Sequence, residues 1–103
     1  MTDNELLQLA AKAAGYDENM TGPCIIDNGF PVSWDSLENT GDATRIAIKL
    51  RFAIDIGNCW ISVQPPQLPG VEFRLTADTQ EQMESIFRRV ITNAAAEIGR
   101  RMP

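Results

Sequence analysis

The chain has 103 residues, of which 44% are hydrophobic and 22% charged, and its net charge at pH 7 is −5. This length and balance are typical of one globular domain with a single hydrophobic core, and the acidic charge argues against nonspecific binding to nucleic acid. Histidine is absent, which excludes the commonest general base and metal ligand, and Cys24 and Cys59 are too far apart for a C-x-x-C zinc site.

Residues 3–14 are predicted to form a helix. Thr2 and Glu5 have the spacing of a capping box, and apolar residues recur at helical spacing after them. Gly15 follows at the position that favours a left-handed C-terminal cap. Because the apolar face is rich in alanine, we expect it to pack closely against another element.

Two short apolar runs flank Asn28-Gly29 and predict a further short hairpin near residues 24–33, with Pro31 keeping the second strand at an edge. A second helix is predicted over about residues 42–52, with Thr40 or Asp42 as its cap. Its core face is expected to comprise Ala43, Ile46, Ala47 and Leu50, widened by Ile48 and Phe52.

An antiparallel hairpin is predicted near residues 59–64 and 71–76, because the second segment alternates apolar and polar residues cleanly. Residues 53–64 alternate only roughly, and the Gly57-Asn58 turn leaves both a strand and a hairpin open. In either case we expect Trp60 in the core.

The last helix is predicted to begin near Asp78 or Thr79 and to carry a wide apolar stripe over about 20 residues. It closes with Arg100 and Arg101, the favourable charge at a helix C-terminus. A stripe this wide would contact both the sheet and another helix, or a second copy. Together with Ala94-Ala95-Ala96, it predicts a homodimer formed through the C-terminal helix.

These elements predict one small α+β domain spanning residues 1–103, in the order α-α-β-β-α, with an antiparallel sheet packed against helices. No apolar run reaches the roughly 20 residues needed to cross a bilayer, and the acidic N-terminus lacks the features of a signal peptide. We therefore expect a cytoplasmic protein that does not bind membranes. Residues 1–44 hold eight acids and one base, so the charge is unevenly distributed.

The acids Asp35, Glu38 and Asp42 are the only acid-base groups arranged as a candidate catalytic cluster. Nothing in the sequence implies that they are buried, so we interpret them as a capped, solvated turn and predict no catalytic residue, metal or cofactor. Trp34 precedes this turn. Its indole could either be buried in the core and anchor the loop or be exposed and contact a partner. The candidate partner-binding residues are Trp34, Asp35, Glu38, Asp42 and Tyr16.

Arginines provide the second candidate site. Arg45, Arg88 and Arg89 are candidate anion-binding residues, which could hold a phosphate between two copies of the chain. No aromatic residues are interleaved with the basic ones, and the chain is acidic overall, so contact with nucleic acid is not expected.

Three blocks carry a resemblance to a known group: "NELLQLAAKAAGY", "WDSLENTGDATRIAIKL" and "FRRVITNAAAEIGRRM". In that order they resemble small uncharacterised proteins of tailed bacteriophages and prophages, related to the NinX-like group. The resemblance implies a phage context and supplies no catalytic residue.

Combined with the missing catalytic groups, the resemblance implies a non-enzymatic phage accessory protein acting in the infected bacterial host. We expect it to bind a protein partner, either a host factor or a component of host defence. The alternative is a small-molecule or nucleotide-binding protein that sequesters its ligand, such as a signalling nucleotide of the host (a sponge protein).

Overall fold

The computed structural model describes residues 2–15, 24–27, 30–33 and 35–102. Its helices are α1 (Asp3–Ala13), α2 (Thr40–Lys49) and α3 (Met83–Arg101), with a short 3-10 turn, η1 (Gln80–Gln82), before α3. The strands are β1 (Cys24–Asp27), β2 (Phe30–Ser33), β3 (Ala53–Ile56), β4 (Trp60–Gln64) and β5 (Phe73–Thr76). The α+β class is confirmed, and the structure adds one strand, β3, before the expected hairpin.

The strands form two antiparallel sheets. The pairing of β1 with β2, with Cys24 opposite Ser33, confirms the short hairpin near residues 24–33, although its turn at residues 28–29 lies outside the described residues. The second sheet has the order β3-β4-β5. The open choice at residues 53–64 is therefore resolved as a hairpin.

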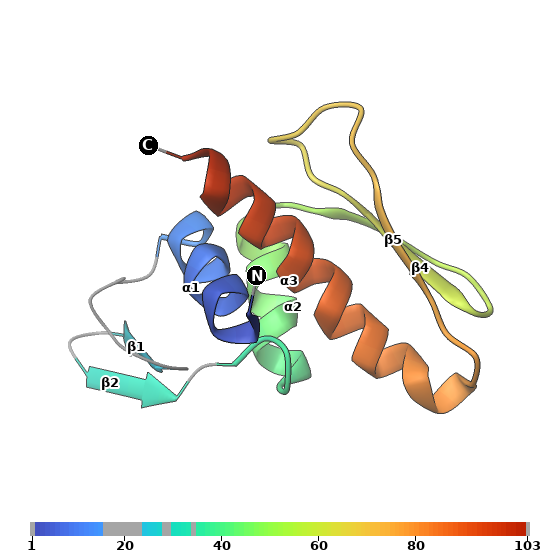
Figure 1. Cartoon of the computed structure of the whole chain (residues 1–103), viewed down its shortest axis with the longest axis horizontal. Coiled ribbons are helices and arrows are strands. Elements are labelled where there is room, and N and C mark those ends of the chain that lie inside the picture. The colour runs from blue at the N-terminus through green and yellow to red at the C-terminus, as the bar shows by residue number, and fades with distance from the viewer. Residues whose placement is uncertain (1, 16–23, 28–29, 34, 103) are drawn as a thin grey trace.

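Helix α3 lies between the two other helices and the three-stranded sheet, as Figure 1 shows. On one side it packs against α1 and α2, and on the other against β4 and β5. This central position explains the width of its apolar stripe. Ala94, Ala95 and Ala96 are at most 2% exposed. These alanines are buried within the chain and offer no surface to a second copy. They therefore do not support the predicted homodimer.

Small residues allow α1 and α3 to approach closely. Ala10 has no exposed surface, and a Cβ atom added at Gly99 would lie only 2.0 Å from the backbone oxygen of Leu9. The ends of α1 match the prediction, since the Thr2 hydroxyl accepts a hydrogen bond from the Glu5 N–H and Gly15 has a φ of 80°. The alanine face of α1 therefore packs against α3.

Trp60 does not lie in the core, contrary to the prediction. Alternation along β4 turns Ile61 and Val63 toward the core and Trp60 to the opposite face. There the guanidinium of Arg74 stacks 4.5 Å from the indole centroid. The indole also occupies the space that a Cβ atom at Gly57 would need, so Trp60 packs against Gly57 in the β3–β4 turn.

Candidate functional site

The acidic turn at residues 35–42 is held together by its own carboxylates. One oxygen of Asp35 accepts hydrogen bonds from the N–H groups of Leu37 and Glu38, at 3.0 and 3.2 Å. The carboxylate of Asp42 accepts the Asp35 N–H at 3.0 Å. Two of the three candidate acids therefore stabilise the turn, which agrees with its interpretation as a structural element, while Glu38 is exposed.

The cap of α2 differs from the prediction. Asn39 caps the helix by accepting the Asp42 N–H at 3.0 Å, in place of Thr40 or Asp42. The hydroxyl of Thr40 instead donates to Glu84 and accepts from Arg88. Thr40 is thus the first residue of α2 and connects this helix to α3.

A buried hydroxyl pair fixes the turn to α3. The hydroxyls of Ser36 and Thr92 lie 2.7 Å apart, and neither residue has exposed surface. Because the Thr92 hydroxyl donates to the carbonyl oxygen of Arg88, Ser36 must donate to Thr92. Arg88 also donates to the carbonyl oxygen of Leu37 at 3.0 Å. These hydrogen bonds hold the acidic turn against α3.

Two of the three candidate anion-binding arginines have partners inside the chain. The side chain of Arg88 is 19% exposed and contacts the turn and Glu84, whereas Arg89 forms an ion pair with Asp3 at 3.0 Å. Arg45 is exposed on α2, and its side chain makes no hydrogen bond or ion pair with any described residue. Of the other candidates, Trp34 and Tyr16 lie outside the described residues.

The exposed face of α2 is the feature that the sequence analysis missed. Ile48 was predicted to widen the core face, but 71% of it is exposed. At about 100° per residue, Ile48 lies roughly 200° around the helix from the buried Ile46, so the helical period would have placed it outside. Arg45 precedes it by three residues and Arg51 follows by three, and both are exposed.

Arg51 adopts a backbone conformation that favours glycine. Its φ is 59°, the only positive φ of a non-glycine residue in the described part of the chain. The N–H of Arg51 donates to Ile48 and that of Phe52 to Ala47, the bonding pattern of a Schellman cap. The helix therefore ends at Lys49, earlier than predicted, and presents Arg51 directly after it. We call Arg45, Ile48 and Arg51 the α2 surface.

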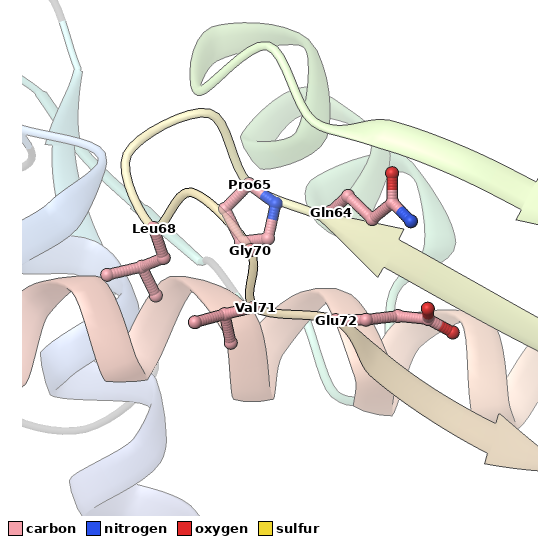
Figure 2. A pocket seen from close by; sticks show the side chains of 6 residues that line it. All are labelled: Gln64, Pro65, Leu68, Gly70, Val71 and Glu72. Carbon is pink, nitrogen blue, oxygen red and sulfur yellow. The ribbon is translucent and has the colours of Figure 1, made fainter.

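None of three hollows in the described part of the chain is lined by these residues. One, shown in Figure 2, adjoins the β4–β5 loop and holds about 220 Å³, below the usual size of a ligand pocket. Another, of about 350 Å³, lies along α1 between Glu5 and Lys12. The third holds about 550 Å³ at the C-terminal end of α3, where Leu50, Leu68 and Ile98 form apolar walls. Among the described residues, no three cysteine, aspartate or glutamate side chains gather to hold a metal ion.

No family model, curated protein or solved structure matches this chain in comparisons with known proteins. The phage resemblance therefore stays a prediction. Over the described ranges, no helix combines the length and the apolar character needed to cross a membrane.

Proposed function

We propose that this protein is a non-enzymatic phage accessory protein that binds a protein partner in the cytoplasm of an infected bacterium. The partner would be a host factor or a component of host defence. The phage resemblance supports the context, and the α2 surface supports the mode of action.

The α2 surface is the observation that carries the proposal. A single exposed isoleucine is ordinary on a protein surface. Ile48, however, is flanked in the sequence by two exposed arginines, three residues to either side, and arginine is enriched among the residues that dominate binding energy at interfaces. An apolar centre with a charged rim is the usual anatomy of a protein interface. This arrangement moves the proposed surface from the acidic turn to the outer side of α2.

The nucleotide-sponge alternative has weaker support. It would use Arg88, Arg89 or Arg45 for phosphate, but Arg88 and Arg89 each already contact an acidic side chain of the same chain. Binding at these two arginines would first have to break those interactions, which leaves Arg45 alone. We therefore favour a protein partner.

Affinity capture from lysate of the bacterial host tests the proposal. The bait proteins would be the wild type, Ile48→Gln and the control Ile56→Gln, which alters an isoleucine that is 65% exposed on β3. A protein retained by the wild type and by the control should be reduced about tenfold or more with Ile48→Gln, since burying an isoleucine is worth about 1.5–3 kcal/mol. Equal retention by all three baits would contradict the proposal.

A further inference from the structure

We infer that the α2 surface binds an acidic protein segment that carries an apolar anchor residue. This inference rests on the proposed function and adds the chemical class of the partner. Between Ala43 and Ile54 the chain carries the exposed Arg45 and Arg51 and no acidic residue, although its net charge is −5. This segment is therefore basic within an acidic chain.

Arg51 provides the second argument. A left-handed residue after a helix is usually glycine, because any side chain there strains the backbone. The Arg51 side chain is exposed and makes no hydrogen bond or ion pair with another described residue, so no such contact offsets the strain. A glycine at this position would end the helix equally well. What arginine adds is a positive charge beside Ile48.

The geometry fits an amphipathic partner. Ile48, 71% exposed, provides the apolar contact, and Arg45 and Arg51 lie three residues to either side of it. Asp42 is the acid nearest to Arg45 in the sequence of α2, and its carboxylate is bound to the Asp35 N–H. An acidic segment would therefore meet two cations around one apolar centre. A nucleic acid fits less well, because the chain is acidic and the α2 surface offers no aromatic side chain for stacking.

Fluorescence anisotropy with three labelled probes tests the inference on the full chain. The probes are a peptide of glutamate and leucine with the leucines at helical spacing, the same peptide with lysine in place of glutamate, and a single-stranded oligonucleotide. We expect the wild type to bind only the acidic peptide, and more weakly as salt concentration rises.

The variants Arg51→Gly, Ile48→Gln and Arg89→Gln separate binding from folding. Arg51→Gly should raise the Tm by about 2–5 °C, because it relieves the left-handed strain, and should weaken binding by about two- to fivefold. Ile48→Gln should weaken binding about tenfold or more. The control Arg89→Gln removes a positive charge outside the α2 surface, at the ion pair with Asp3, and should leave the Kd unchanged.

Several results would overturn the inference. A lower Tm with unchanged affinity for Arg51→Gly would give Arg51 a purely structural role. Binding of the lysine peptide or the oligonucleotide as tightly as the acidic peptide would exclude an acidic partner. A dimer detected by light scattering and lost in Arg51→Gly would make the occupant a second copy. A lysate partner that depends on Ile48, without any binding of the acidic peptide, would refute the acidic class and leave the proposed function standing.

Discussion

The substitution Gly99→Ala tests how closely α1 and α3 pack. In an ordinary helix position, this change would stabilise the protein by about 1 kcal/mol, because alanine has the higher helix propensity. Here the new Cβ atom would lie 2.0 Å from the Leu9 oxygen and 2.8 Å from its carbonyl carbon. A comfortable carbon-to-oxygen contact is about 3.3 Å, so the two helices would have to separate by roughly 1.3 Å.

Backbone atoms cannot rotate away, so the cost should reach the upper part of the range of about 1–3 kcal/mol known for overpacked cores. After the gain in helix propensity, we expect Gly99→Ala to lower the free energy of unfolding by about 2 kcal/mol. This loss corresponds to a fall in Tm of about 10 °C for a domain of this size. Urea denaturation followed by circular dichroism would measure the difference.

The matched control is Gly70→Ala. Gly70 has a φ of 79° and no atom within 4 Å of the added Cβ, so its substitution should cost only the left-handed strain of about 1–2 kcal/mol. Because Gly99 lies in a regular helix, its cost can come only from contact with α1. A Gly99→Ala variant as stable as the wild type would show that the helices are not in this contact.

Two further predictions concern single interactions. Thr92→Val keeps the shape of the side chain but leaves the buried Ser36 hydroxyl without its acceptor, so it should cost about 1–3 kcal/mol. Adding Ser36→Ala should recover part of that loss in urea denaturation, and additive losses would contradict the hydroxyl pair. Hydrogen bonds from Arg100 and Arg101 lower the pKa of Glu97 from 4.5 to about 2. Their stabilisation should therefore be complete above about pH 4.5 and disappear as the pH falls toward 2. The stability difference between wild type and Glu97→Gln should be below about 1 kcal/mol per exposed pair at pH 7 and should shrink over this range, whereas a constant difference would refute the assignment.

The sequence was sufficient for the features that depend on local patterns. Helical spacing identified α1 and α3, Thr2 and Gly15 marked the ends of α1, and alternation identified β5. The strand β3 was harder to assign, because it begins four residues after α2 ends and its Ile56 is mostly exposed. A strand with one uncovered apolar position loses the clean alternation on which the prediction depends.

Contacts between distant residues account for the other differences. Asn39, Thr40 and Asp42 could each cap α2, and the choice depends on Arg88 and Glu84, which occupy the Thr40 hydroxyl. The pairing of Ser36 with Thr92 spans 56 residues and has no local signal. Asp35 and Asp42 were correctly interpreted as structural, but the reason, a turn fixed to α3, required the tertiary structure.

The α2 surface shows why a failed prediction can be informative. The second helix was predicted to run to about residue 52, where sequence typical of a strand begins. The structure ends it at Lys49 with a left-handed arginine. Natural sequences violate local preferences mainly at functional or strained sites. Arg51, which follows the helix in a left-handed conformation, is the residue whose charge we assign to partner binding. The variant Arg51→Gly separates its role in ending the helix from its role in binding.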